Sequence, residues 1–478
     1  MNLGNGRDAA PGQAAAIARS VRTGRRTAVS VIEEAVELIE RVDPYLNAVI
    51  ASDHARALSA ARSIDTRIRA GEDVGPFAGV PFTVKDVIAT EGLPTTCGSR
   101  AVTGTRDDED ATAVARMRAA GAILIGKTNC PEFAFSVLTD NDRFGPTINP
   151  IEIQSPATGP QQLVAGGSSG GEAVAIAAGF SVVGLGTDFG GSVRWPAQCT
   201  GVLGLRPTVG RVPATGQLPG VGGGPWPPNP RTLQGRLQVI GPMGRSVDDV
   251  EATLRVVAGP DAFDSTAVPA LLGDSAAIDL RTVECRWETS IGELAVDAEV
   301  AVAVEYAAEL LRSAGVRASR GLPPAMDHAH SIYSRLRDAE PLTELRNAIA
   351  GREGSVTRHI AEVLEAGMSV SEDELTRLWA RRDLLRADLL GWLRGERILA
   401  LPVSTVAPFA SAAGLPFRGG RRLSEPEVVA PCRLVSLFGL PSLSVPVMTS
   451  ATGVPISVQL VGPPFREDLV LAAARAVH

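Results

Sequence analysis

Residues 166–207 contain two serine-bearing glycine loops, and no other stretch restricts the fold of the chain as strongly. Ser168 lies in the sequence GGSSGG, and Ser192 lies in DFGGSVR. Glycine permits positive φ angles and allows a ligand to approach the backbone closely. Between the loops, EAVAIAAGF predicts a short buried helix and SVVGLGT predicts a buried strand. We therefore expect one helix and one strand to bring both hydroxyls together beside backbone N–H donors.

A base for such a nucleophile must come from elsewhere, because no histidine is close to either serine in the sequence. The five histidines are His54, His328, His330, His359 and His478. Lysine can act as the base when burial lowers its pKa. Lys85 lies inside the apolar, strand-like run AGVPFTVKDVI at residues 78–88. Because lysine is seldom fully buried without a partner, Lys85 is a candidate base.

Several motifs together resemble the amidase signature family: GVPFTVKD, GGSSGG, GTDFGGSVRWPA and GLRPT. The resemblance continues through GAILIGKTNCPEFA, FGPTINP, LFGLPSLSVPV and PISVQLVGPPFRED, and leaves out only about residues 260–400. It implies that Ser192 is the nucleophile, that Ser168 is a bridging serine on a cis peptide bond, and that Lys85 is the base. The separation of the serines, 192 minus 168 or 24 positions, agrees with the spacing of that family.

The implied reaction is amide hydrolysis through a covalent acyl-enzyme. Neutral Lys85 would take the Ser192 proton by way of Ser168, and the same relay would later protonate the leaving nitrogen. Lysine has an ordinary pKa of about 10.4, so burial must lower it substantially. The oxyanion hole is expected to consist of the backbone N–H groups of Phe189, Gly190, Gly191 and Ser192.

Three neighbouring side chains are expected to support these groups. Asp188 and Arg194 flank the nucleophile and either take part in catalysis or, as we favour, form an ion pair that holds the loop. Ser169 is expected to hydrogen-bond within the network. The reaction needs no metal or cofactor. The pair of histidines in MDHAH does not face one way on a helix, so we do not interpret it as a metal site.

Alternating strand and helix patterns predict an α/β protein. We expect a single α/β/α domain with a large mixed, mostly parallel central sheet covered by helices on both faces. Residues 1–12 are expected to form a flexible tail, and residues 13–478 one domain with a signature core at about 75–210 and helical cover at about 260–400. The loop at 208–235 is either a solvated connector or a pocket rim carrying Trp226.

Composition narrows the range of partners and compartments. The net charge is −7, and acidic and basic residues are interspersed, which argues against nucleic acid or an anionic membrane as the partner. The five cysteines lack CxxC spacing, which favours reduced thiols and a cytoplasmic location. The N-terminus lacks the pattern of a signal peptide. The longest apolar stretch, near 173–187, is too short to span a bilayer.

Other functions remain open at this stage. Residues 166–170 also fit the G-x-S-x-G elbow of an α/β-hydrolase, which would make Ser168 the nucleophile of an esterase. Some relatives are the amidase subunit of a tRNA-dependent amidotransferase, but CPEFAFSVLTDND departs from the MDEFAMGS-like stretch of that subunit, so we favour a stand-alone amidase. A catalytically dead homologue is the third possibility. The expected substrate is a small amide or carbamate, aliphatic, aryl, amino-acid derived or a lactam, with esters as side substrates. A homodimer is possible.

Overall fold

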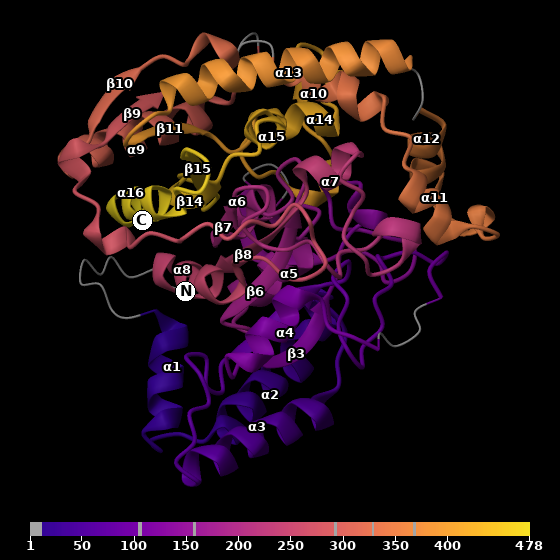
Figure 1. Ribbon diagram of the computed structural model, residues 1–478, viewed down its shortest axis with the longest axis vertical. Coiled ribbons are helices and arrows are strands. Elements are labelled where there is room, and N and C mark those ends of the chain that lie inside the picture. Colours follow the sequence, from indigo (N-terminus) through magenta and orange to yellow (C-terminus); the bar gives the residue numbers. More distant parts are fainter. Residues whose placement is uncertain (1–11, 104–107, 156–158, 291–293, 327–328, 367–369) are drawn as a thin grey trace.

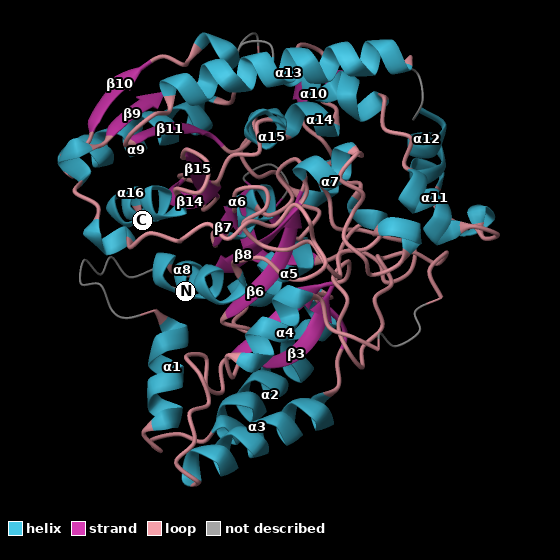
Figure 2. Ribbon diagram, viewed as in Figure 1, coloured by secondary structure: helices cyan, strands magenta, loops and turns pink. Residues whose placement is uncertain are grey.

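The structure is a computed structural model that describes residues 12–103, 108–155, 159–290, 294–326, 329–366 and 370–478. The tail expected at residues 1–12 lies, except for Gly12, outside the described residues, as does His328. Figure 1 shows the arrangement of the elements, and Figure 2 shows helices packed around a central sheet.

Eleven strands of the described chain form the central sheet. Their spatial order is β1 (Val49–Ala51), β3 (Ile123–Thr128), β2 (Pro81–Lys85), β6 (Val183–Asp188), β8 (Val239–Gly244), β7 (Leu203–Arg206), β14 (Ser442–Thr449), β15 (Pro455–Val461), β11 (Arg397–Pro402), β9 (Glu284–Trp287) and β10 (Arg317–Arg320). Two further two-stranded sheets pair β4 (Ile148–Ser155) with β5 (Gly159–Val164), and β12 (Phe417–Arg418) with β13 (Arg421–Arg422).

The sheet is large and mixed, as expected. Parallel pairing is concentrated in two groups, β3–β2–β6 and β11–β9–β10. Within each group, neighbouring strands run parallel, as expected for the sheet. The strands that lie between the two groups pair antiparallel. The reason is clearest at β14 and β15, which a short turn joins into a hairpin, and hairpin partners must run in opposite directions.

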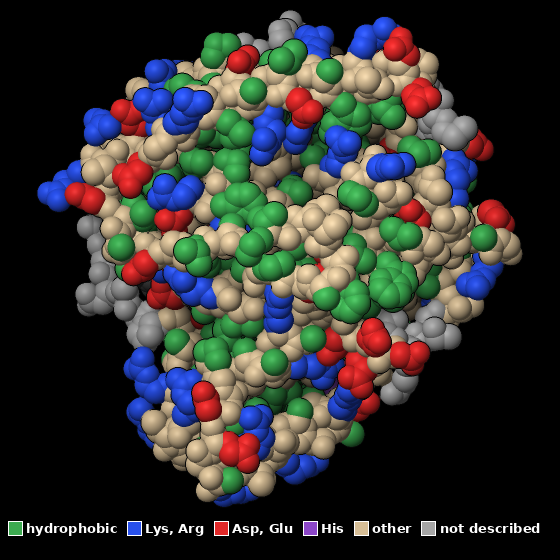
Figure 3. Space-filling view, in the orientation of Figure 1, with side chains coloured by type: hydrophobic (Ala, Val, Ile, Leu, Met, Phe, Trp, Pro, Cys, Tyr) green, Lys and Arg blue, Asp and Glu red, His purple; other side chains and the backbone are tan. Residues whose placement is uncertain are grey.

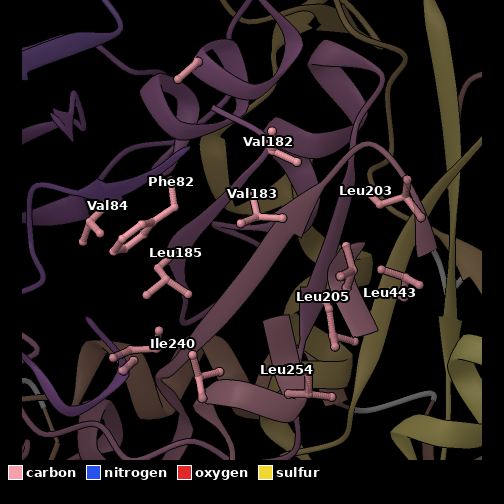
Figure 4. Close-up of a cluster of buried hydrophobic side chains, with 14 of the residues drawn as sticks. Phe82, Val84, Val182, Val183, Leu185, Leu203, Leu205, Ile240, Leu254 and Leu443 are labelled. Atoms are coloured by element: carbon pink, nitrogen blue, oxygen red, sulfur yellow. The ribbon is translucent and has the colours of Figure 1, made fainter. Parts of the chain in front are cut away.

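Helices cover both faces of the sheet. One layer consists of α4 (Thr112–Ala119), α8 (Val247–Val257), α16 (Glu467–Val477) and α9 (Ala298–Ser313), each in contact with the next. The opposite face carries α5 (Gly170–Ala177) and α6 (Arg194–Thr200), which follow the two serine loops. Strand β6 separates these layers. A Cβ on Gly184 would collide with Glu172 of α5, whereas Val183 and Leu185 belong to the apolar core with Leu254 of α8 (Figure 4).

The remaining helices pack around this core. Near β3 are α2 (Ala28–Leu46) and α3 (His54–Arg69), whereas α1 (Gln13–Arg22) packs on α8. Helix α15 (Ala430–Leu437) contacts β11, and α10 (Ala329–Asp338) contacts both α15 and α13 (Glu372–Trp392). Helix α11 (Thr343–Ile349) contacts residues 221–223, and His359 of α12 (Arg358–Ala366) contacts Phe135. Two short helices, α7 (Leu233–Leu237) and α14 (Glu425–Val428), complete those of the described residues. Residues 260–400 therefore contain helices, as expected, but also strands β9 and β10, which extend the sheet and which the residue pattern did not reveal.

The structure also shows how the charged side chains and the cysteines are distributed. Acidic and basic side chains are interspersed on the face shown in Figure 3. None of the helices in the described ranges combines the length and apolar character needed to cross a bilayer. All five cysteines are buried thiols. Within the described part of the chain, His, Cys, Asp and Glu side chains form no group of three or more suited to a metal ion.

Candidate active site

Lys85 ends strand β2 and is completely buried. The parallel strands β3 and β6 pair with β2 on its two sides. Lys85 Nζ donates to Ser168 Oγ at 2.6 Å and to Thr187 Oγ1 at 2.9 Å. Burial lowers the pKa of Lys85 to about 8. The side chain therefore becomes neutral at a pH where an ordinary lysine remains almost fully charged.

Ser168 lies in the loop that precedes α5, and it is completely buried. The Gly167–Ser168 peptide bond is cis, as the family resemblance implied. This loop packs tightly against α6, because a Cβ on Gly166 would lie 2.6 Å from Pro196 Cα. The φ angle of Gly166 is also positive, at 74°, so glycine suits the position for two reasons.

Ser192 lies in the second loop, between β6 and α6, and is partly exposed. The two loops are joined directly, because Ser169 N donates to Ser192 O at 3.1 Å. The side chain of Ser169 supports the same region, since its Oγ accepts from Thr187 N at 3.3 Å. Both Ser168 and Ser192 line one cavity, together with Thr187. The structure thus brings the three candidate catalytic residues to one site.

The buried carboxylate of Asp188 organises the loop that carries Ser192. It accepts from Arg194 Nε at 3.0 Å and from Arg194 Nη2 at 2.9 Å. Arg206, which the sequence did not single out, adds a second cation, with Nη1 3.4 Å from Asp188 Oδ1. Burial alone would raise the pKa of Asp188, but the charges of both arginines and their hydrogen bonds outweigh it and hold the pKa far below its usual range. Asp188 therefore stays ionised and forms the expected ion pair.

One N–H group that we expected in the oxyanion hole, that of Gly191, donates to Asp188 instead. Gly191 N donates to Asp188 Oδ1 at 2.9 Å, and Val193 N donates to Asp188 Oδ2 at 3.2 Å. A buried carboxylate needs donors, and the turn supplies the nearest N–H groups. The N–H of Gly191 is therefore directed at Asp188 in this structure, and its part in the oxyanion hole stays a prediction. The N–H groups of Phe189, Gly190 and Ser192 remain as candidates for the oxyanion hole.

The sequence analysis did not single out two further polar residues at the site. Thr187 is the second hydrogen-bond partner of Lys85 and lies inside the GTDFGGS motif. Its position directly before Asp188 is the only feature of the sequence that could have indicated a role at the site. Glu172 is completely buried on α5, and its carboxyl contacts the hydroxyls of Thr83 and Thr128. Burial raises the pKa of Glu172 to about 7, so near neutrality much of this carboxyl is protonated.

The cavity beyond the serines encloses about 790 Å³, counting the part open to solvent. Residues 133–137 form one wall, and α10, α15 and the loop at 208–235 contribute the others. The segment 208–235 reaches the cavity through Leu218 and, in α7, through Gln234. Trp226, the residue expected on the rim, is instead 56% exposed and packs against Phe263 with ring centroids 6.1 Å apart.

The surroundings of Ser168 also bear on the elbow hypothesis. An α/β-hydrolase nucleophile is activated by a histidine. Ser168 Oγ instead accepts from Lys85. Two of the histidines that the structure describes have other contacts: His54 is 3.5 Å from Glu40, and His359 Nε2 is 2.8 Å from Phe135 O. The geometry therefore favours the lysine relay over the elbow.

Comparison with known proteins identifies the family. The Amidase family model matches residues 30–471, which is most of the chain. The chain belongs to the amidase family. One subunit of the glutamyl-tRNA(Gln) amidotransferase of Carboxydothermus hydrogenoformans is 31% identical to it, over 96% of this chain and 95% of the relative.

Solved structures of amidase signature enzymes show the same fold. The 6-aminohexanoate cyclic dimer hydrolase has a TM-score of 0.80 and 29% identity, and the match covers 97% of this chain and 96% of that one. A bacterial aryl acylamidase of the amidase signature family has a TM-score of 0.81 and 26% identity, covering 98% of this chain and 96% of that one. This amidase is therefore a hydrolase of carbon–nitrogen bonds.

Proposed function

We propose that this chain is a stand-alone amidohydrolase that forms an acyl-enzyme on Ser192, with Ser168 as proton bridge and Lys85 as base. The observation that carries the proposal is the buried contact of 2.6 Å between Lys85 Nζ and Ser168 Oγ. A lysine with a pKa of about 8 can accept a proton near neutral pH, which an ordinary lysine cannot do efficiently. Ser192 lines the same cavity as Ser168 and is partly exposed.

The reaction proceeds in two halves. Ser192 Oγ attacks the amide carbon while its proton passes to Ser168, whose own proton passes to Lys85. The oxyanion that forms is held by the N–H groups of the loop that carries Ser192. Collapse breaks the C–N bond, and the relay returns a proton to the leaving nitrogen. Water then attacks the acyl-enzyme through the same relay, releasing the carboxylic acid and restoring Ser192.

A second candidate function is the amidase subunit of a tRNA-dependent amidotransferase. The name of the Carboxydothermus relative favours it, since the match spans almost both whole chains. The wall segment CPEFAFSV favours the stand-alone enzyme, because it departs from the sequence that we associate with that subunit. Purification from the native host separates the candidates. A stand-alone amidase elutes alone and hydrolyses amides, whereas an amidotransferase component co-purifies with partners and needs them for hydrolysis.

Substitutions at the site test the proposed roles. We expect Ser192→Ala to lower the kcat for amide hydrolysis by roughly 10⁴-fold or more, because residues of one catalytic unit act together. Lys85→Met and Ser168→Ala should also lose most activity. Ser313→Ala, on the exposed surface of α9, is the matched control and should retain full activity. Activity that survives Lys85→Met and Ser192→Ala but is lost in Ser168→Ala would overturn the relay in favour of the elbow.

A further inference from the structure

Two guanidinium groups line the cavity that holds both serines. Arg337 comes from α10 and Arg433 comes from α15, and these two helices pack side by side (Figure 1). The Arg337 guanidinium lies over the ring of Phe135, 4.5 Å from its centroid. The Arg433 guanidinium lies 5.2 Å from the centroid of Tyr333. Aromatic faces thus hold both cations in place without consuming their hydrogen-bond donors.

Arg433 lies next to the catalytic loop. A Cβ built on Gly190 would be only 3.3 Å from Arg433 Cγ and 2.7 Å from Tyr333 Oη. Gly190 is two residues before Ser192, so the Arg433 side chain starts beside the loop that carries the nucleophile. Arg433 and Ser192 also line the same cavity.

Neither arginine has an acidic partner at contact distance among the residues that the structure describes. Within the described ranges their nitrogens take part in no ion pair within 4.0 Å, and Arg433 Nε is buried there without a hydrogen-bond acceptor. Burial lowers the pKa of both guanidinium groups, although both stay charged at physiological pH. Both residues are half-buried, and the charges of Glu340, Glu425 and Asp338 act on them only from beyond contact distance. An anionic ligand in direct contact with the two guanidinium groups would gain charge-assisted hydrogen bonds.

The carboxylates of the same cavity already have partners. Glu340 accepts from Leu233 N at 2.6 Å. Glu425 accepts from Ser136 Oγ at 2.7 Å and from Val137 N at 3.0 Å, and so holds the wall of residues 133–137 in place. Hydrogen bonds from the walls therefore occupy both carboxylates, whereas the two guanidinium groups make no hydrogen bond among the described residues and keep donors for a ligand.

We propose that the substrate carries a carboxylate that Arg433 and Arg337 bind together. This inference rests on the proposed function and names its substrate class: half-amides of short dicarboxylic acids, with the carboxylate on the acyl side. The planar fork of arginine suits a carboxylate, because two parallel N–H donors match its two oxygens. An α-ammonium on the same chain places a third cation beside the two arginines, so a free amino acid amide binds less well.

Three ligands of equal chain length test the inference: glutaramate, neutral valeramide and zwitterionic glutamine. Their binding to Ser192→Ala protein is measured by titration calorimetry, so the readout does not depend on hydrolysis. We expect glutaramate to bind at least tenfold more tightly than valeramide and glutamine, as charge-assisted hydrogen bonds allow. Adding Arg433→Met should remove this preference, and Arg433→Lys should restore it only in part. Arg358→Met, on exposed α12, is the matched control and should keep it.

Each outcome has a definite meaning. Equal binding of valeramide and glutaramate, a preference that survives Arg433→Met, or no detectable glutaramate binding at millimolar concentration would overturn the anionic subsite. Tightest binding by glutamine would also overturn it and favour the amidotransferase function. None of these results bears on the acyl-enzyme, which is tested separately by hydrolysis in the Ser192→Ala variant. Arg337→Met supplies a second, independent variant if Arg433→Met folds poorly.

Discussion

Replacing Lys85 by methionine should change how the stability of the protein depends on pH. The pKa of Lys85 falls from its ordinary value of 10.5 to about 8 on folding. Because one pKa unit corresponds to about 1.4 kcal/mol, keeping the buried amine charged costs about 3 kcal/mol. Below pH 8 the wild type carries this whole cost, since the amine is protonated in both folded and unfolded states.

The sign of the pH dependence follows from proton binding. Between pH 8 and 10.5 the folded amine is neutral while the unfolded amine is still protonated, so the unfolded state binds more protons and stability rises with pH. Lys85→Met lacks this titration. Relative to the variant, the wild type should therefore gain about 2 kcal/mol of unfolding free energy between about pH 7 and pH 9.5. The hydrogen bonds lost from Ser168 and Thr187 lower the stability of the variant by about 1 kcal/mol each, nearly independently of pH.

Urea denaturation of both proteins at the two pH values measures this change, with refolding checked at each pH. Comparing the proteins at the same pH cancels the titration of every other group. We expect the difference in unfolding free energy to shift by about 2 kcal/mol in favour of the wild type at the higher pH. A difference that stays constant within about 0.5 kcal/mol would refute the lowered pKa and the reasoning built on it.

Three further results follow from the same geometry. The kcat/KM for amide hydrolysis should rise about tenfold per pH unit below pH 8 and level off above it, as Lys85 loses its proton; a flat profile from pH 6 to 9 would contradict this. Asp188→Asn leaves two arginines buried without their counter-ion, so urea denaturation should show a loss of about 3–5 kcal/mol; a loss below about 1 kcal/mol would count against it. Gly190→Ala brings a methyl group 2.7 Å from Tyr333 Oη, so kcat should fall at least tenfold with little change in Tm; unchanged kcat would show that the loop tolerates displacement.

The catalytic trio could be predicted from the sequence because each member lies in a short contiguous pattern. The glycines in each serine loop determine its local backbone conformation, and the apolar run around Lys85 predicts that this side chain is buried. The oxyanion donors could be predicted only in part, since the N–H of Gly191 turns toward Asp188 and its direction depends on how the buried carboxylate sits. Strand β8 was missed because its residues, VIGPMG, are rich in glycine and proline, so only its partners β6 and β7 define it.

The residues that form the walls of the cavity could not be predicted from the sequence. Arg337 and Arg433 are separated by 96 positions, 433 minus 337, and only the packing of α10 against α15 brings them together. Each arginine resembles an ordinary surface residue of an amphipathic helix. The loop at 208–235 was open to two interpretations, a solvated connector or a rim carrying Trp226. Leu218 of that loop lines the cavity, whereas the ring of Trp226 packs against Phe263.

The protonation state of one buried amine can be measured directly, because Lys85 and Lys127 are the only lysines in the chain. Protein labelled with ¹³C at the lysine ε-carbon should give two resonances, and the one missing from Lys85→Met is assigned to Lys85. We expect its chemical shift to titrate with a pKa near 8. A pKa at the ordinary lysine value of about 10.4 would contradict the account, because the side chain could not then serve as the base near neutral pH.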